Sequence, residues 1–446
     1  MRNILLLFSL LALAACNSQP DSNGDIADAP SDAAEANSTQ SDDSDAGDAS
    51  DDDASAASAN DAEAAAETPR SVETRDREAP HLEPAFADQT RAPIPQETEA
   101  WALETVAEGL EHPWAIAFLP DESMLVTERP GRLRHVSADG SVSEPLEGVP
   151  EVDNRRQGGL LDVAVAPDFE SSRTIFLSFS EPHEDGTNNT ALGRGRLSED
   201  HSAIEDFEVI FSQQPNVEST GHYGSRIVFE DDDTLWLTMG DRQGHPVRQN
   251  AQDPTNHIGT VVRLNFDGSI PDDNPFVGHK ENAPEIWSWG HRNIQAAAKD
   301  ASGRLWTVEH GPRGGDELNR PEAGKNYGWP AISYGIEYGG GDVYEGQARA
   351  EGMEQPVYFW DPVIAPSGMD FYSGDAFEAW QGDLFVGGLR SELVSRLVLE
   401  DDRVVGEEWL EIGSRVRDVA TGPDGALYLV TDESDARVLR IVPGED

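Results

Sequence analysis

Short apolar runs that follow acidic or glycine-containing turns recur throughout the last three-quarters of the chain. Each combines apolar and β-branched residues with a preceding turn, which is the pattern of a strand in a hairpin. No amphipathic pattern of about 18 residues competes with them as a helix. The six segments are 119–128, 166–180, 229–241, 300–311, 378–389 and 422–433.

The spacing of these segments indicates how the strands are organised. They recur at intervals of roughly 40 to 80 residues, which is typical of blades around an axis, because one blade cannot bury both of its faces without neighbours. A β-sandwich is the alternative, but its strands recur every 8 to 12 residues or so without this longer period. The sequence therefore predicts an all-β protein with a six-bladed β-propeller.

Hairpin geometry then predicts which polar residues meet. Residues equidistant from a turn lie at the same end of the two strands, so His222 and Asp241, on either side of the turn near residue 232, should meet at one rim. A set of cationic and polar residues in two other hairpins should reach the same kind of end: Arg292, Asn293, His310, Gly311, Pro312, Arg415 and Arg417. Such a set would hold a negatively charged planar ligand, although solvated rim charges are the alternative that spacing leaves open.

The first 16 residues have the pattern of an export signal. One arginine precedes an apolar run, residues 4–15, that is too short to span a bilayer as a permanent helix. Residues 13–16, Leu-Ala-Ala-Cys, resemble the lipobox of bacterial lipoproteins, which predicts lipid attachment at Cys16, the single cysteine. A buried cysteine in an ordinary cleaved signal is the alternative. Acylation would anchor the protein to a membrane, and Asn17 favours the outer membrane of a Gram-negative bacterium, facing the periplasm.

Residues 17–100 are predicted to be an acidic disordered tether. They carry 22 acidic residues against 4 arginines, and their Ala, Asp, Ser and Asn-rich first part cannot bury enough apolar surface to fold. All ten tryptophans lie at or beyond Trp101. The folded domain is therefore expected at residues 101–446.

Charge and cysteine content exclude several classes of protein. The chain has 85 acidic and 32 basic residues, a net charge of −53 and only three lysines, which argues against a nucleic-acid partner and against binding to anionic lipid by charge. A salt-rich habitat and simple solubility explain this charge equally well. One cysteine excludes a disulfide framework, and the sequence has no C-x-x-C-H motif for a c-type haem.

A series of ordered motifs carries a family resemblance across residues 104–442. They are HPWAIAF, LVTERPGRLRHV, QGGLLDVAVAPDF, GHYGSRIVF, TVVRLNFDGSIPDDNPF, GHRN, EHGPRGGDELN, KNYGWP and TGPDGALYLVTDE. Together they resemble the soluble PQQ-dependent aldose sugar dehydrogenases, the glucose/sorbosone dehydrogenase family. The resemblance implies a six-bladed propeller, pyrroloquinoline quinone (PQQ) with Ca²⁺ as cofactors, and oxidation of aldoses at C1 to lactones.

The resemblance also assigns roles to individual residues. His222 matches the catalytic base, which Asp241 would orient, and Arg292 would contact the reactive carbonyl oxygen of the cofactor. At position 390 the better-studied relatives carry Lys, so Arg390 is a departure that keeps the charge but changes the hydrogen-bond geometry. The positions that match cofactor contacts are Gln157, Arg292, Asn293, Tyr338, Arg390, Arg415 and Arg417.

Two calcium positions follow from the same resemblance. The carbonyls of Gly311 and Pro312 match the cofactor-calcium segment, and Glu317 with the carbonyl of Tyr327 matches a structural calcium site, since Ca²⁺ takes several oxygen ligands. A surface carboxylate is the alternative for Glu317. Electrons would pass to an external acceptor, a quinone or a cytochrome.

Two other functions remain open on the sequence alone. A calcium-dependent propeller lactonase would use a metal-bound water and would not need the arginines. A non-catalytic propeller that binds glycans or proteins would need neither His222 nor a cofactor. The pattern of residues 331–356 does not indicate which sugar is bound, and the sequence specifies neither the acceptor nor the oligomeric state.

Overall fold

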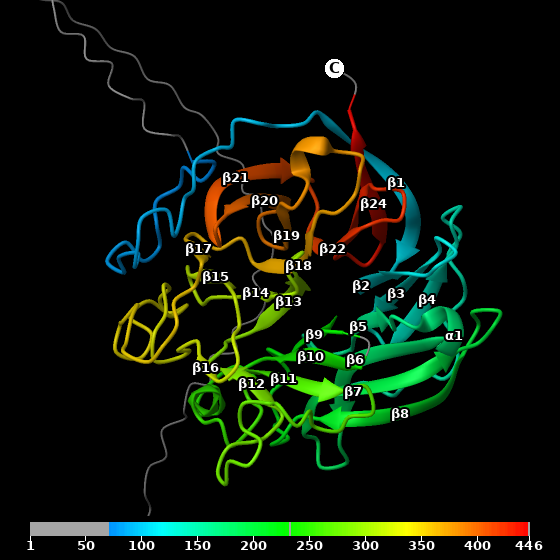
Figure 1. Ribbon diagram of the computed structural model, residues 1–446, viewed down its shortest axis with the longest axis horizontal. Helices are drawn as coiled ribbons and strands as arrows, with labels where there is room; N and C mark the ends of the chain where they lie inside the picture. The colour runs from blue at the N-terminus through cyan, green and yellow to red at the C-terminus, as the bar shows by residue number, and fades with distance from the viewer. Residues whose placement is uncertain (1–70, 232, 445–446) are drawn as a thin grey trace, which may run out of the picture. The chain divides into compact units, whose positions relative to one another are not determined.

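The computed structural model describes residues 71–231 and 233–444, which form six sheets arranged around a central axis, antiparallel except for one short parallel pair (Figure 1). The only α-helix in this part of the chain is the single turn α1 (Phe169–Ser172), beside two 3₁₀ turns, η1 (Val247–Gln252) and η2 (Glu378–Trp380). The predicted all-β six-bladed β-propeller is confirmed. Each of the six turn-plus-strand segments provides the second strand of one blade.

The blades follow one another along the chain. The first three consist of β2 (Pro113–Phe118), β3 (Met124–Glu128) and β4 (Arg132–Val136); β5 (Leu160–Val165), β6 (Thr174–Pro182), β7 (Asn188–Leu197) and β8 (Ile204–Ser212); and β9 (Gly224–Phe229), β10 (Thr234–Met239), β11 (Thr260–Asn265) and β12 (Ile286–Trp289), to which β16 (Lys325–Asn326) adds. The last three consist of β13 (Ile294–Lys299), β14 (Leu305–Glu309), β15 (Asp316–Asn319) and β17 (Tyr358–Trp360); β18 (Pro366–Phe371), β19 (Leu384–Gly388), β20 (Leu393–Glu400) and β21 (Arg403–Glu411); and β22 (Val416–Thr421), β23 (Leu427–Thr431), β24 (Ala436–Pro443) and β1 (Trp101–Leu110).

The ring closes in two ways. The first strands of the blades, β2, β5, β9, β13, β18 and β22, contact one another in sequence, and β22 returns to β2. The last blade joins both ends of the propeller, because β1 pairs antiparallel with β24 from Trp101↔Pro443 to Leu110↔Ala436. This pairing leaves the last blade with an outer strand from the start of the domain, which locks the ring.

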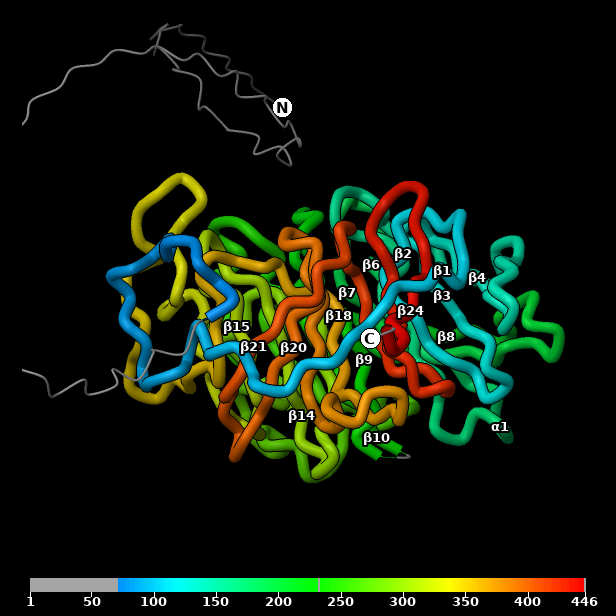
Figure 2. The backbone as a smooth tube through the Cα atoms, turned by 90° about the horizontal axis from the view of Figure 1, so that it is seen from above, coloured from blue at the N-terminus to red at the C-terminus, as the bar shows by residue number. Residues whose placement is uncertain are grey.

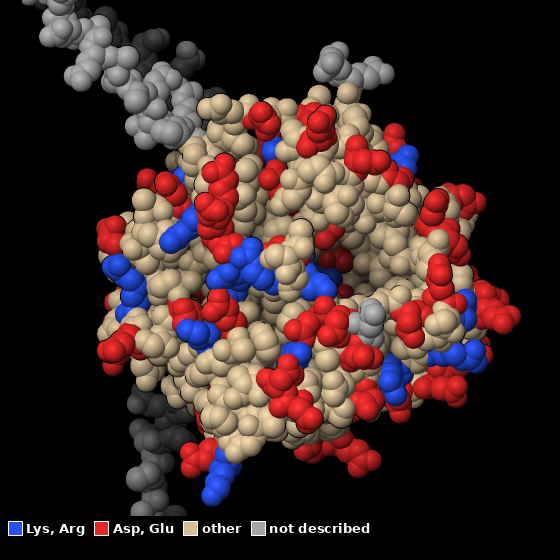
Figure 3. Space-filling view, in the orientation of Figure 1, with Lys and Arg blue, Asp and Glu red and all other residues tan. Residues whose placement is uncertain are grey.

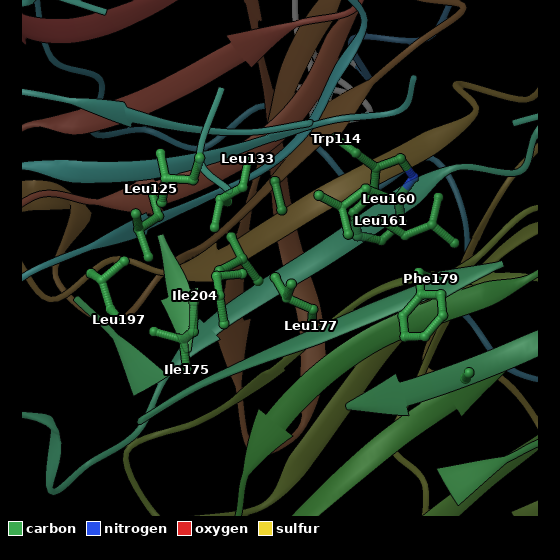
Figure 4. Packing of buried hydrophobic residues seen from close by; sticks show 14 of the residues in the cluster. Trp114, Leu125, Leu133, Leu160, Leu161, Ile175, Leu177, Phe179, Leu197 and Ile204 are labelled. Atoms are coloured by element: carbon green, nitrogen blue, oxygen red, sulfur yellow. The ribbon is translucent and has the colours of Figure 1, made fainter. Parts of the chain in front are cut away.

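Apolar side chains from neighbouring blades interdigitate. Figure 4 shows one such layer, in which Leu125 and Leu133 of one blade face Leu160, Ile175 and Leu177 of the next. All five are fully buried. Each blade therefore buries its faces against its neighbours, which is the reason the sequence period exists.

A buried ion-pair triad holds three of the innermost strands together. Arg226 on β9 donates to Asp162 on β5 at 3.0 Å and to Asp418 on β22 at 3.3 Å, and all three residues are buried. Asp418 also accepts the backbone N–H of Ile116 on β2. Pairing and hydrogen bonding are what make such buried charges tolerable.

Residues 71–100, the N-terminal strap, correct the predicted domain boundary. They were expected to belong to the tether, yet they lie against the propeller, with Ala79, Leu82, Gln89 and Ala92 buried. Polar contacts hold them: the backbone of Gln89 accepts from Phe359 N–H, and that of Pro93 accepts from Glu407 N–H. A prediction of disorder from apolar content alone misses a segment that polar contacts hold against the rest of the domain. Residues 17–70, and the signal sequence before them, lie outside the described residues.

Charged side chains cover much of the surface. On the face drawn in Figure 3, Asp and Glu side chains are spread over most of the surface, and Lys and Arg side chains include a group near the middle. Within residues 71–231 and 233–444, no helix is long and apolar enough to cross a membrane.

Candidate active site

His222 and Asp241 meet at one rim of the propeller, as their similar distances from the turn near residue 232 predict. His222 precedes β9 and Asp241 follows β10, and His222 Nδ1 lies 2.6 Å from Asp241 Oδ1. Both side chains are buried. The backbone of His222 takes a left-handed conformation, with φ 51°, and its N–H donates to Gln157 Oε1 at 2.8 Å. This backbone is therefore held in place by the side chain of another blade.

The electrostatics of this pair favour a neutral imidazole beside an ionised carboxylate. Burial lowers the pKa of His222 below its usual value, the charge of Asp241 opposes that effect, and Arg292 adds to it. Burial acts to raise the pKa of Asp241, but the charge and hydrogen bond of His222 outweigh it, so the pKa lies below its usual value. An ionised carboxylate can only accept, so His222 carries its proton on Nδ1 and leaves Nε2 with a free lone pair.

Two further donors fix the carboxylate of Asp241. Trp329 Nε1 donates to Oδ2 at 2.7 Å, and the backbone N–H of Gln243 donates to Oδ1 at 2.7 Å. With His222, these donors occupy both oxygens, which sets the orientation of the carboxylate and hence of the imidazole.

Arg292 lies beside this dyad in a mostly buried position. Its Nη1 donates to the carbonyl of His310 at 2.8 Å, its guanidinium lies 5.2 Å from the centre of the Trp329 ring, and its Nε has no partner among the described residues. Glu309 accepts the backbone N–H of Arg292 at 2.5 Å. The hairpin β13–β14 thus places near the dyad a cation whose Nε has no described partner, close enough for its charge to act on His222.

His310 is a second imidazole at this rim, in a partly buried position. Burial, together with the charges of Arg292, His222 and Arg417, lowers its pKa to about 3. Its Nε2 lies 2.7 Å from the carbonyl oxygen of Pro366, to which it donates as a neutral ring. His310 is therefore a neutral group that adds no charge to the site.

The last blade contributes an arginine cluster. Arg417 is buried, donates to Asp432 at 2.8 Å and to Gln295 at 3.2 Å, and keeps an Nε without a partner among the described residues. Arg415 donates to the same carboxylate at 3.3 Å and to the carbonyl of Leu389 at 3.1 Å. The Leu389 contact places Arg415 beside exposed Arg390, for whose side chain the structure describes no hydrogen bond.

Asp432 is the counter-charge of this cluster. Burial acts to raise its pKa, but Arg417, His112 and Arg129 hold the pKa well below its usual range. One carboxylate thus serves several guanidinium groups, which leaves positive charge available for an anionic ligand.

Asn293 and Tyr338, the remaining predicted cofactor contacts, lie in different environments. Asn293 is buried, and its Oδ1 accepts from Gln295 Nε2 at 3.2 Å and from the backbone of Gly224 at 3.3 Å, so it joins the dyad side to the arginine side. Tyr338 lies on the 335–346 loop, with 56% of its surface exposed. The structure shows no hydrogen bond from Tyr338 to the dyad.

The predicted calcium ligands fall into two groups. Gly311 and Pro312 follow β14, and the backbone N–H of Gly311 donates to Asp316 at 2.8 Å. Glu317 pairs with Glu309 across β14 and β15, and burial together with the charge of Glu309 raises its pKa well above the usual value. Among the described residues, no three His, Cys, Asp or Glu side chains form a metal site. Calcium stays a prediction that depends largely on backbone carbonyls.

Tyr327 is linked to this carboxylate pair through His291. Its ring stacks on His291 with ring centres 4.7 Å apart, and His291 Nδ1 lies 3.0 Å from Glu309. The structure therefore brings Tyr327 and Glu317 to the same neighbourhood, around Glu309.

Sequence reasoning missed Trp329, Glu309 and Asp432. Trp329 stands in the KNYGWP motif and Glu309 in EHGPRGGDELN, so the motifs contained both residues without indicating their contacts. Asp432 lies eight residues beyond residue 424 in the turn and Arg415 nine residues before it, so counting outward from the turn would have paired the two residues.

Comparison with known proteins fits this arrangement. The pattern of the family described as "Glucose / Sorbosone dehydrogenase" matches residues 110–440. The aldose sugar dehydrogenase YliI of Escherichia coli is 46% identical over 346 residues, which cover 76% of this chain and 92% of that protein.

Solved structures of aldose sugar dehydrogenases share this fold. The soluble aldose sugar dehydrogenase of Escherichia coli in its apo-form has a TM-score of 0.74 at 46% identity, covering 77% of this chain and all of that one. The PQQ-bound form of the aldose sugar dehydrogenase from Streptomyces coelicolor has a TM-score of 0.64 at 27% identity, covering 77% and 99%. This chain belongs to the glucose/sorbosone dehydrogenase family.

Proposed function

We propose that this protein is a PQQ-dependent dehydrogenase that oxidises aldose sugars at C1 to lactones. The observation that carries the proposal is the buried dyad, in which Asp241 holds the Nδ1 proton of His222 and leaves Nε2 as the basic nitrogen, with the charge of Arg292 nearby. Family membership and the aldose sugar dehydrogenases among the relatives support it.

The residues at the rim fit the chemistry of PQQ, a planar quinone with several carboxylates. Arg292 and Arg417 are both buried and each has an Nε without a partner among the described residues. Buried donors of this kind call for acceptors, which carboxylate and carbonyl oxygens provide. Arg415, Arg417 and exposed Arg390 would bind the carboxylates, and Arg292 would bind the quinone oxygen.

His222 acts as the general base. Bound PQQ would supply the acceptor for the hydride from C1 of the sugar. Nε2 of His222 removes the proton of the C1 hydroxyl, and the ionised Asp241 stabilises the resulting imidazolium. Because the pKa of His222 is lowered, its base form persists at neutral pH.

Arg292 and its surroundings stabilise charge without exchanging protons. A guanidinium stays protonated, so it provides fixed positive charge next to an oxygen that becomes anionic. Glu309 holds its backbone, and Trp329 links it to Asp241, so the base and the cation keep a constant relative position.

We further propose calcium at both predicted positions. Glu317 supports the structural position, because a partly buried carboxylate beside Glu309 is better accommodated with a cation than without one. Export, attachment through Cys16 to the outer membrane on its periplasmic side, and transfer of electrons to an external quinone or cytochrome rest on the sequence alone.

Reconstitution tests the proposal. The purified chain, with and without PQQ and Ca²⁺, is assayed for dye reduction over a panel of aldoses, and His222→Ala is the matched variant. We expect activity that needs PQQ, and a loss of about 10²- to 10⁴-fold in the variant with PQQ binding retained. Lactone hydrolysis without PQQ would instead indicate the lactonase, and sugar binding without turnover the binding propeller.

A further inference from the structure

The N-terminal strap, residues 71–100, is fastened to the propeller by a buried carboxylate. Asp361 follows β17 and is 2% exposed. Its oxygens accept from Arg77 Nε at 3.2 Å, from Glu78 N–H at 2.7 Å and from Ala79 N–H at 3.1 Å. All the donors that the structure describes for this carboxylate come from the strap. Without the strap, Asp361 would be a charge without hydrogen-bond donors, so the propeller is built to receive this segment.

The strap lies outside the residues that define the family. The family pattern begins at residue 110, whereas the strap ends at residue 100. The position of the strap beside the loop of residues 335–346 is visible in Figures 1 and 2, where the blue segment lies next to the yellow one.

An ion pair and a histidine–carboxylate hydrogen bond connect the strap to the 311–316 segment and to the loop of residues 335–346. Glu78 pairs with Arg313 at 2.6 Å, next to the Gly311–Pro312 segment. His81 Nε2 lies 2.9 Å from Asp342, on the loop that carries Tyr338. One strap thus contacts both the segment expected to bind the cofactor calcium and a loop that borders the candidate site.

The 311–316 segment and the loop of residues 335–346 also bind each other. Arg313 and Ile336 exchange two backbone hydrogen bonds, each 2.9 Å long. On the inner side, Asp316 accepts from Gly311 N–H at 2.8 Å and from the N–H groups of Ile364 and Ala365, which lie just beyond Asp361. The 311–316 segment, the 335–346 loop and the strap therefore form one hydrogen-bonded unit.

We propose that the strap is a positioning element of the site, which orders the 311–316 segment for the cofactor and the 335–346 loop for the sugar. The second half of this statement rests on the proposed function. Asp361 is the anchor, because buried charge-assisted hydrogen bonds are strong. The Glu78–Arg313 ion pair and the His81–Asp342 hydrogen bond are partly exposed, so each contributes little stability alone. They connect the anchored strap to the two segments without holding it in place themselves.

Two variants of the full chain test this role. Asp361→Asn removes the anchor charge from the propeller, and Glu78→Gln removes the link to Arg313 from the strap while leaving the propeller sequence unchanged. The matched control is Phe86→Leu, which removes the contact between the Phe86 ring and Arg403, 3.6 Å away, on the part of the strap that faces β21.

The first readout is hydrogen exchange without cofactor. In Asp361→Asn we expect exchange at least about 5-fold faster in residues 71–85, 311–316 and 335–346 together, and in Glu78→Gln faster exchange in 311–316. In Phe86→Leu we expect faster exchange within the strap only. Exchange in 311–316 and 335–346 that matches the parent in Asp361→Asn, whether or not the strap loosens, would overturn the proposal.

The second readout separates positioning from stability. The dissociation constant of PQQ and the KM for an aldose should each rise about 5- to 10-fold in Asp361→Asn, with kcat at saturating cofactor and sugar changed less than about 2-fold. An equal fall in kcat and melting temperature, with KM and PQQ affinity unchanged, would show a purely structural strap. Failure of the parent to bind PQQ would reject the proposed function, while the exchange result would still decide the role of the strap.

Discussion

Replacing Asp241 by Asn tests the dyad most directly. The carboxylate accepts from His222, Gln243 and Trp329 at 2.6, 2.7 and 2.7 Å, and the amide keeps its size but loses its charge. A carboxamide oxygen can accept from some of these donors, but its NH₂ group cannot accept from any. If the NH₂ group faces His222, the imidazole shifts its proton to Nε2 and loses the free nitrogen that the base role requires.

The size of the effect follows from the hydrogen bond that is lost. A hydrogen bond to a charged group contributes about 1.5–3 kcal/mol, which corresponds to a factor of roughly 10 to 150 in rate. We therefore expect kcat/KM of Asp241→Asn to fall by about 10- to 150-fold. His222→Ala, which removes the base itself, should lose more.

The pH profile gives a second, independent outcome. Asp241 raises the pKa of His222, so its removal lowers that pKa further below 6.5. The base form then persists to lower pH, and the acid limb of kcat/KM should move toward lower pH in the variant, although its plateau is reduced. A lower plateau with an unmoved acid limb would show that His222 is not the titrating base.

The assay is dye reduction with an aldose at saturating PQQ and Ca²⁺, recorded across pH. Asp370→Asn is the matched control, because Asp370 is a carboxylate in another blade that accepts the backbone N–H of Thr421 at 2.7 Å. The control should keep kcat/KM within about 2-fold of the parent. Activity of Asp241→Asn equally close to the parent would refute the dyad.

Three further predictions concern the arginines, His310 and calcium. Arg417→Lys should weaken PQQ binding at least about tenfold in a titration, because the buried guanidinium of Arg417 donates from more than one nitrogen. Arg390 is exposed, so Arg390→Lys should change PQQ binding less than about 3-fold. Equal effects of the two substitutions would contradict the role of Arg417 in cofactor binding. The pKa of His310 is about 3 in the folded protein, against an ordinary value of 6.5, so between these pH values the unfolded chain binds more protons. The free energy of unfolding from urea titrations should therefore fall as pH decreases from about 6.5 to about 3, by up to about 1.4 kcal/mol per pH unit. The slope should be flatter in His310→Gln. Chelation with EDTA should lower the melting temperature, and most of that effect should vanish in Glu317→Gln, where the calcium ligand is gone; an unchanged melting temperature in the parent would argue against calcium at Glu317.

The sequence was sufficient for the architecture because hairpins are local. A turn and the two strands beside it lie within about 20 residues, and their alternation and turn residues are written in that stretch. The six turns therefore identified six blades, and counting outward from one turn placed His222 opposite Asp241. The family resemblance then supplied roles for residues that spacing could only bring together.

The local sequence pattern could not predict contacts between residues far apart in the chain. Trp329 reaches Asp241 across 88 positions of sequence, and Arg77 reaches Asp361 across 284. No local period records such pairs, since they depend on the course of long loops and on how the blades stack. The structure alone revealed that Trp329 orients the dyad.

The N-terminal strap shows the same division most clearly. By composition, residues 71–100 have few apolar side chains and many charges, so the sequence on its own indicates a disordered tether. In the tertiary structure, a buried carboxylate and the backbone beside β17 provide the partners that this segment lacks within itself. The sequence determined six blades and the pairing of His222 with Asp241 because these depend on neighbours along the chain. Only the tertiary structure decided the strap and the contact of Trp329, because their partners are neighbours only in space.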